Sequence, residues 1–172
     1  MKKSRKAPAR KRPVKRTRST ARRSQPSNLT KLTTAMGLAT ITIPRIGEYF
    51  PGQGGVLHGI MAGQDGKPDY LLISAEKKHH HVGAAFAEMQ EYPKGLTIDG
   101  HNDFKMPTRK EQRVQWANAK PGQFEGAYYW SCEQSAYDSA YAWSQNFNHG
   151  NQYYWHKGYK YRGCAVRRVP IR

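Results

Sequence analysis

Positive charge is concentrated at the N-terminus of this chain of 172 residues, and this segregation limits which part of it can fold. Fourteen of the 29 Lys and Arg residues precede the first acidic residue, Glu48, and the other 15 face all 12 Asp and Glu residues. Most of the formal net charge of +17 therefore comes from the N-terminal residues before Glu48, and it does not indicate a basic nucleic-acid-binding domain. The length and the 37% of apolar residues suit one modest domain.

Residues 1–27 contain three prolines and almost no apolar side chain beyond Ala and Val14. Such a segment cannot bury enough apolar surface to offset its chain entropy, so we predict a disordered basic arm. Its uses are phosphate neutralisation with counterion release, binding to an acidic protein surface, a cellular address or simple solubilisation. The candidate nucleic-acid-binding residues are the basic residues of this arm: Lys2, Lys3, Arg5, Lys6, Arg10, Lys11, Arg12, Lys15, Arg16, Arg18, Arg22 and Arg23.

Residues 28–46 shift in composition to Thr, Ala, Leu and Ile and are expected to lead into the fold. Within them, the alternation over Ala39–Ile43 predicts a strand that Pro44 ends. Two apolar runs follow, Val56–Ala62 and Tyr70–Ser74, separated by the turn sequence GQDGKPD. They predict a β-hairpin.

Two helices are predicted next. The first covers Val82–Tyr92 and ends before Pro93; its apolar positions at i, i+3, i+4 and i+7 are Val82, Ala85, Phe86 and Met89. The second runs from Thr108 to about Lys120. Thr108 and Glu111 have the spacing of a capping box, and Val114 is expected to pack inward.

Thirteen of the 20 aromatic residues lie between Phe124 and Tyr161. They fall in the short alternating runs YYWSC, AYAWSQNF and NQYYWH, and CAVRRVPI closes the chain, which together predict short antiparallel strands. Trp130, Trp143 and Phe147 have the clearest strand pattern and are expected inside. The two tryptophans should lie in one core on adjacent or facing strands.

This region holds more aromatic side chains than the core of such a domain needs, so part of it is expected to be an exposed recognition face. Tyr and Trp supply rigid contact area, and Asn and His supply adaptable hydrogen bonds. We predict one exposed ligand-binding cluster formed by Tyr137, Tyr141, Asn148, His149, Asn151, Tyr153, Trp155, His156, Tyr159 and Tyr161. The alternative is an aromatic core with ordinary loops.

Four segments in this order resemble a known family: DGHNDFKMPTRKEQ (99–112), AYYWSCEQ (127–134), AWSQNFNHGNQ (142–152) and YRGCAVRRV (161–169). They are similar to the domain at the C-terminus of Lcl-type collagen-like adhesins and in many phage-encoded proteins of unknown function. That family shows a W-R-L-P-T-x-x-E helix start and then strands with Y-W-S-S-T-E, A-W-x-x-x-F-x-x-G and V-R-x-V-R.

The resemblance implies an α+β, C-type-lectin-like fold over residues 47–172, with two helices, a small antiparallel sheet and both termini in one sheet. The chain departs from the family at Lys105 and Met106, at Cys132, and at Gly163 and Cys164. These departures raise the question whether the two cysteines are neighbours, and their redox state stays open.

Related proteins of this fold include the variable proteins of diversity-generating retroelements, in which Asn codons are converted to Tyr, Ser, Asp, His and Cys codons. The same residue types crowd Ser131–Tyr161, although ordinary selection for binding produces the same composition.

No catalytic residue, metal or cofactor is expected. Asp99, His101 and Asp103 have acid–base chemistry, but their sequence is that of a solvated turn. Residues 79–81 are three histidines after two lysines and are expected in a surface loop. The enzymes of related fold, the formylglycine-generating type, need a closely spaced cysteine pair that this chain lacks. The Glu-Pro-Asn and Trp-Asn-Asp triplets of calcium-dependent lectins are also missing.

The sequence thus favours a non-enzymatic binding protein, encoded by a phage, that recognises a protein or glycan on a host or target surface and whose arm engages nucleic acid or an acidic partner. The alternative is a structural virion or nucleic-acid-associated protein with the body as its assembly domain. No apolar run of membrane-spanning length or secretory signal is apparent, so we expect no membrane insertion and a place in the cytoplasm or in a virion. The oligomeric state stays open.

Overall fold

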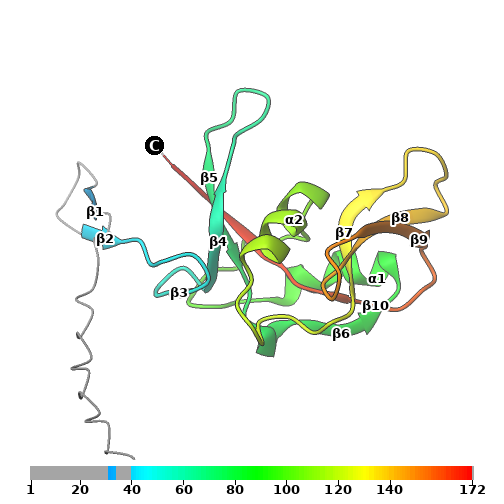
Figure 1. The fold of residues 1–172 in the computed structure, drawn as a ribbon. Helices are drawn as coiled ribbons and strands as arrows, with labels where there is room; N and C mark the ends of the chain where they lie inside the picture. The colour runs from blue at the N-terminus through cyan, green and yellow to red at the C-terminus, as the bar shows by residue number, and fades with distance from the viewer. Residues whose placement is uncertain (1–30, 34–39, 172) are drawn as a thin grey trace, which may run out of the picture.

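The computed structural model describes residues 31–33 and 40–171 (Figure 1). The basic arm predicted over residues 1–27 lies outside the described residues. Of the segment that leads into the fold, two short strands are described, β1 (Lys31–Thr33) and β2 (Thr40–Thr42), which pair antiparallel. The strand predicted over Ala39–Ile43 corresponds to β2.

A four-stranded antiparallel sheet joins the beginning and the end of the body. Its order is β11-β5-β4-β3, with β3 at Tyr49–Phe50, β4 at Gly55–Met61, β5 at Tyr70–Ser74 and β11 at Val166–Pro170. The predicted hairpin is confirmed as β4–β5, and its loop end projects away from the rest of the molecule (Figure 1). Phe50, Leu57, Leu71 and Ile73 form the buried core of this sheet.

The second sheet has five strands in the order β6-β10-β7-β8-β9. They are β6 (His81–Ala84), β7 (Tyr128–Gln134), β8 (Tyr141–Asn146), β9 (Gln152–His156) and β10 (Tyr161–Gly163). Strands β7, β8 and β9 form an antiparallel meander, as predicted. The expectation of purely antiparallel strands is wrong at β10, which pairs parallel with β7 because the chain crosses back from β9 to lie between β6 and β7.

Helix α1 is shorter than predicted. It covers Phe86–Glu91 and is followed by a 3-10 turn over Tyr92–Gly95. Met89 is buried as its periodicity predicts, but Val82 lies exposed in β6. The prediction failed there because β6 pairs with β10, a segment far along the chain, and this ladder overrides local periodicity.

Helix α2 (Arg109–Asn118) begins at the predicted capping box. The Thr108 hydroxyl accepts from the Glu111 backbone N–H at 3.2 Å, and the Glu111 carboxylate accepts from the Thr108 backbone N–H at 2.7 Å. The inward face is polar, because Glu111, Gln112 and Gln115 are buried there. Val114, expected to pack inward, is only partly buried.

The buried polar residues of α2 join the two sheets, between which the helix lies (Figure 1). Gln112 Nε2 donates to the carbonyl oxygens of Tyr129 and Trp130 in β7, at 3.1 and 2.9 Å. Gln115 Nε2 donates to Ser74 Oγ in β5 at 2.8 Å. Directional hydrogen bonds, rather than an apolar seam, therefore fix α2 against both sheets.

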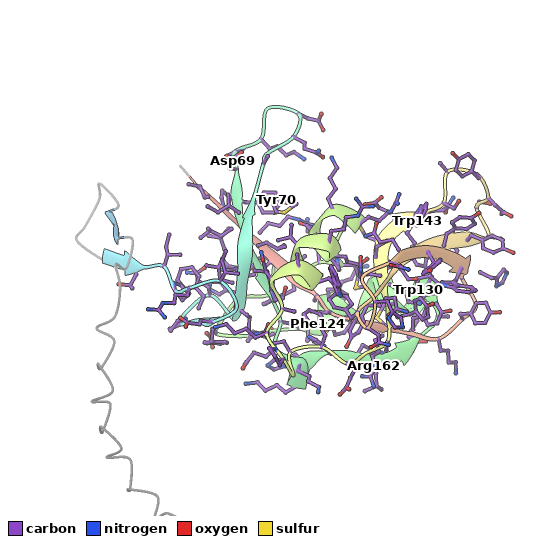
Figure 2. All side chains as sticks on the ribbon, viewed as in Figure 1. Asp69, Tyr70, Phe124, Trp130, Trp143 and Arg162 are labelled. Atoms are coloured by element: carbon purple, nitrogen blue, oxygen red, sulfur yellow. The ribbon has the colours of Figure 1, made fainter. Side chains whose placement is uncertain are left out.

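Trp130 and Trp143 lie on adjacent strands but not in one core (Figure 2). Trp130 is fully buried with Met89, Met106 and two alanines. Trp130 is paired with Ser144, the neighbour of Trp143, and neighbouring side chains in a strand point to opposite faces. Trp143 is therefore half-buried on the other face, and the expectation of one shared core is wrong.

The described residues form an α+β body with two α-helices, which confirms the predicted class. Phe147 is half-buried rather than fully inside and stacks on Phe124 with ring centroids 4.0 Å apart. Both cysteines are free. The buried Cys164 thiol lies 3.6 Å from Gln115 Nε2 and 3.7 Å from the Ala75 carbonyl oxygen.

Candidate functional site

The ten residues predicted as one ligand-binding cluster are divided among two faces of the five-stranded sheet and two loops. Pairing with β8 fixes the alternation of β9: Tyr153 and Trp155 lie on the face of Ser144, whereas Tyr154 and His156 lie on the face of Trp143. The prediction of a single cluster is thus wrong, since a sheet separates its members.

One face carries a continuous set of five aromatic side chains, which we call the aromatic face: Tyr128, Tyr153, Trp155, Tyr159 and Tyr161. Ring centroids lie 5.1 Å apart for Tyr128 and Tyr161 and 5.7 Å apart for Tyr128 and Trp155, and Tyr159 stacks parallel to Tyr161 at 5.9 Å. Tyr153 and Tyr159 are 42% and 53% exposed. The structure brings four of the predicted residues together here and adds Tyr128.

The aromatic face rests on the apolar core and is electrically neutral. The Tyr161 ring lies 4.8 Å from the buried Trp130 ring. Burial, followed by the nearby Tyr128 and Tyr159, raises the pKa of Tyr161 to about 12. Its hydroxyl stays protonated at neutral pH and offers a hydrogen-bond donor without charge.

The opposite face carries a second aromatic group that includes two predicted residues, Tyr141 and His156. Their rings lie 5.7 Å apart, and Tyr141 lies 6.1 Å from Tyr154. Tyr154 contacts Trp143 at 5.2 Å, and the Arg109 guanidinium covers Trp143 at 3.4 Å from the ring centroid. This arrangement explains the partial burial of Trp143, which packs under a cation rather than in the core.

The other predicted residues lie in loops. Asn148, His149 and Asn151 are exposed in the turn between β8 and β9, and Asn151 Nδ2 donates to the Tyr153 hydroxyl at 3.0 Å. Tyr137 lies in the loop between β7 and β8 and is 92% exposed. Only Asn151 among these loop residues is thereby connected to the aromatic face.

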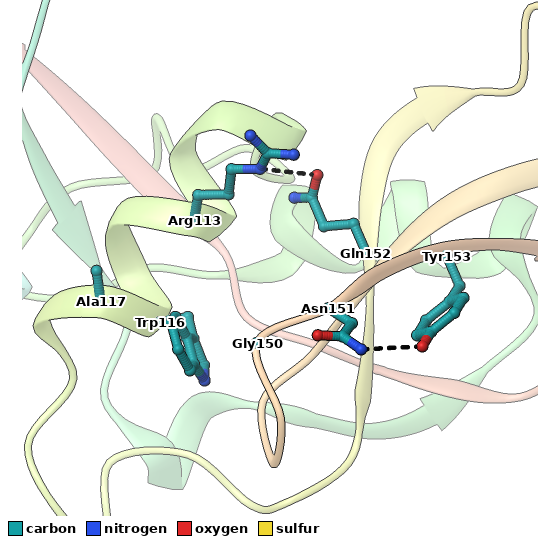
Figure 3. Close-up of a pocket in the computed structure, with 7 residues that line it drawn as sticks. All are labelled: Arg113, Trp116, Ala117, Gly150, Asn151, Gln152 and Tyr153. Carbon is teal, nitrogen blue, oxygen red and sulfur yellow. Dashed lines mark hydrogen bonds between the residues drawn. The ribbon is translucent and has the colours of Figure 1, made fainter.

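A groove of about 610 Å³ separates α2 from the start of β9 (Figure 3). Its lining consists of Arg113, Trp116, Ala117, Gly150, Asn151, Gln152 and Tyr153. Arg113 Nε donates to Gln152 Oε1 at 3.2 Å. Gly150 is required here, because its φ is +81° and a Cβ at this position would lie 2.5 Å from the Trp116 ring. The groove meets the aromatic face at Tyr153, so ring surface, amides and a guanidinium lie along one path.

Sequence reasoning missed Tyr128, Arg113, Trp116 and Gln152. Tyr128 could have been found from its spacing of two from Trp130, which places both on one face of a strand. No local pattern marks the groove, because it forms between a helix and a turn that are distant in the sequence.

The turn at residues 99–103 supports structure. Asp99 Oδ2 accepts from the Tyr49 hydroxyl at 2.7 Å and from the backbone N–H groups of Gly52 and Gly54 at 3.2 and 3.3 Å. The Tyr49 hydrogen bond and these backbone donors lower the pKa of Asp99 below its ordinary value. Asp103 pairs with Arg167 at 2.6 Å. Asp99 and Asp103 therefore stabilise the neighbouring loops through these hydrogen bonds and this ion pair.

The expectation of a surface loop is wrong for His81, which begins strand β6, and for His80. The His80 ring is partly buried against Phe124 and Tyr129, at 5.1 and 5.7 Å, and burial lowers its pKa to about 4. His58 is buried beside the same Phe124 ring and its pKa is also lowered to about 4, chiefly by burial. Both imidazoles are therefore neutral at neutral pH and serve as packing groups.

Within residues 31–33 and 40–171, no group of three or more His, Cys, Asp or Glu side chains is arranged to hold a metal ion. The helices described in this part of the chain are too short or too polar to cross a membrane. Comparisons of the chain with protein-family models and with curated proteins gave no match.

Proposed function

We propose that this chain is a non-enzymatic ligand-binding protein, encoded by a phage, that recognises a protein or glycan on a host or target surface. The observation that carries the proposal is the aromatic face, in which five side chains are in ring contact and two of them, Tyr153 and Tyr159, are open to solvent. Contiguous exposed aromatic surface is unfavourable in water and is typical of recognition sites.

The chemistry of this surface suits recognition. Tyr and Trp provide large contact areas with few rotatable bonds, so little side-chain entropy is lost on binding. Binding energy is concentrated in such residues where they lie near the centre of an interface. The groove beside Trp116 extends the surface with the Arg113 guanidinium and the amides of Asn151 and Gln152.

We further propose a C-type-lectin-like arrangement of the body and a basic arm that engages nucleic acid or an acidic partner. Two features support the first part: β3, near the start of the body, and β11, at its end, share one sheet, and two α-helices accompany the sheets. The proposed role of the arm is supported by its positive charge alone.

Ligand capture can be tested with the full-length chain on intact host cells and on a panel of immobilised glycans. The variant Tyr153→Ser/Tyr159→Ser removes two exposed rings and is expected to abolish capture while the melting temperature changes little. The matched control, Tyr137→Ser/Ile60→Ser, removes two exposed apolar side chains outside the aromatic face and should bind normally.

Undiminished capture by the Tyr153→Ser/Tyr159→Ser variant would refute the assignment of the aromatic face. Equal losses in the test and control variants would show nonspecific adhesion instead. Failure of the unaltered protein to bind any cell or glycan would contradict the proposed function as a whole.

A further inference from the structure

Strand β9 is an unprotected sheet edge. It is the terminal strand of the five-stranded sheet in the described part of the chain. Its five residues, Gln152–His156, include no Lys, Asp, Glu or Pro, and its pairing with β8 has no register shift. Natural proteins usually blunt exposed edges with charges, proline or bulges, because unpaired backbone groups template further pairing. The absence of these features indicates a strand that is paired in use.

The outward backbone groups of β9 can be assigned from its hydrogen bonds to β8. At one end, the Asn151 carbonyl accepts from the Asn146 N–H at 2.8 Å, and at the other the Lys157 N–H donates to Ala140 at 2.9 Å. Backbone groups alternate in direction along an antiparallel strand. Residues 151, 153, 155 and 157 therefore face β8, and Gln152, Tyr154 and His156 direct their N–H and C=O groups outward. The outward carbonyl oxygen of His156 already accepts from the Tyr159 N–H at 3.0 Å, and within the described residues no such bond is made by the outward groups of Tyr154.

We propose that β9 pairs antiparallel with β9 of a second copy of this chain, around a twofold axis at Tyr154. Centred there, Tyr154 exchanges two hydrogen bonds with its symmetry mate, and the Gln152 carbonyl oxygen accepts from the His156 N–H of the second copy, while the His156 carbonyl oxygen keeps its bond to Tyr159. This is the isologous contact of a C2 dimer. It goes beyond ligand binding and does not depend on it.

The side chains fit the same register. Residues directly opposite each other share a face, so Tyr153 lies beside Trp155 of the second copy and the two Tyr154 rings meet on the other side. The first charged residue after the strand, Lys157, falls opposite Asn151, so no like charges are opposed. The contact covers Tyr154, which is exposed in the single chain, and joins the aromatic faces of the two copies at Tyr153 and Trp155. This self-match favours a second copy over an unrelated extended peptide.

The dimer would place both aromatic faces on one side of a continuous ten-stranded sheet, because opposite residues in a ladder lie on the same face. A surface bearing repeated ligands would then be bound at two sites at once. Such bivalency strengthens binding without any new contact.

Disulfide trapping in the full chain tests the register. Opposed residues of a hydrogen-bonded pair have Cα atoms about 5.5 Å apart, within the range that a disulfide spans. In a Cys132→Ser background, Tyr154→Cys is expected to form a covalent dimer on mild oxidation much faster than the control Tyr137→Cys, which is more exposed but lies in a loop. Cross-linking of Tyr154→Cys no faster than the control would overturn the proposal.

Sedimentation of the unlinked chain supplies an independent test. Tyr154→Pro removes one outward N–H and no bond to β8, so it should raise the dimer dissociation constant by about tenfold or more. Tyr154→Ala keeps the backbone donor and should weaken the dimer less. A protein that is monomeric at every soluble concentration, or a Tyr154→Pro variant that dimerises normally, would overturn the proposal. Disulfide trapping decides the question if Tyr154→Pro does not fold.

Discussion

Replacing Arg168 by methionine should destabilise the protein more than replacing its partner Glu111 by glutamine. The Glu111 side chain is fully buried, whereas the Arg168 side chain is 29% exposed. Arg168 donates from Nε and Nη2 to the two carboxylate oxygens at 2.6 and 2.8 Å, and the Tyr70 hydroxyl donates at 2.8 Å. Arg168→Met leaves a buried carboxylate without its counter-charge.

The expected magnitudes follow from this asymmetry. Removing one partner of a buried ion pair costs about 3 to 5 kcal/mol of unfolding free energy when the remaining charge cannot reach water. Glu111→Gln leaves a guanidinium that is already partly hydrated, and the amide oxygen still accepts one hydrogen bond. Its cost should be about 1.5 to 3 kcal/mol, the range for losing hydrogen bonds to a charged group.

The pH dependence adds a second signature. Burial raises the pKa of Glu111, but Arg168, the Thr108 backbone and Tyr70 outweigh it and hold the pKa below its ordinary value. In the wild type, the stabilisation that comes from the lowered pKa of Glu111 is fully present above the pKa that Glu111 has in the unfolded chain, and it is lost as pH falls through the pKa of the folded protein. Without Arg168 the pKa should rise instead, so that the folded variant binds a proton readily. The difference in stability between wild type and Arg168→Met should shrink as pH falls from 7 toward 4.

Urea denaturation of wild type, both single variants and the double variant at several pH values measures these quantities and the coupling between the two residues. A loss below about 1 kcal/mol for Arg168→Met at pH 7 would refute the reasoning, since that is the range of exposed pairs. A difference that grows at low pH would refute the electrostatic argument even if the fold is destabilised.

Three other outcomes are expected. Trp130→Ala should cost about 3 to 5 kcal/mol in urea denaturation and Trp143→Ala clearly less, because Trp143 is half-buried under Arg109; equal costs would contradict their placement on opposite faces. Because the pKa of His58 is lowered to about 4, the unfolded chain binds its proton first as pH falls below 6.5, and about 3 kcal/mol of stability should be lost by pH 4. A His58→Gln variant should show a flatter profile, and an unchanged profile would exclude His58 as the cause. Deleting residues 1–24 should remove any affinity for DNA or RNA that the full chain shows in filter binding. The affinity of the full chain should fall steeply as the salt concentration rises. If the truncated protein keeps its affinity, the nucleic-acid site lies in the body.

The elements that depend on residues close together in the sequence were predictable. The start of α2 depends on Thr108 and Glu111, three residues apart, and the β4–β5 hairpin on two apolar runs around one turn. Val82 shows where such reasoning ends, because it fits a helical period but lies in β6. The partner that decides the matter, β10, is distant in the sequence and too short to have a pattern of its own.

The candidate site was predicted in part for a similar physical reason. Aromatic density drew attention to the region of Tyr153–Tyr161, where the aromatic face lies, since this property is local. Alternation separates the two faces of a strand but does not reveal what covers each face. The position of Trp143 under Arg109, and the groove between Trp116 and Gly150, depend on how α2 crosses the sheet.

The manner in which α2 holds β7 has a consequence for how the protein can change over evolutionary time. The Gln112 amide donates hydrogen bonds to the main-chain carbonyl oxygens of Tyr129 and Trp130 in β7. Carbonyl oxygens are the same whatever side chain a residue carries. Tyr128, the neighbouring position on the aromatic face, can therefore be exchanged without loosening this attachment. Adaptation to a new target can proceed through such outward positions while the relation between helix and sheet is inherited unchanged.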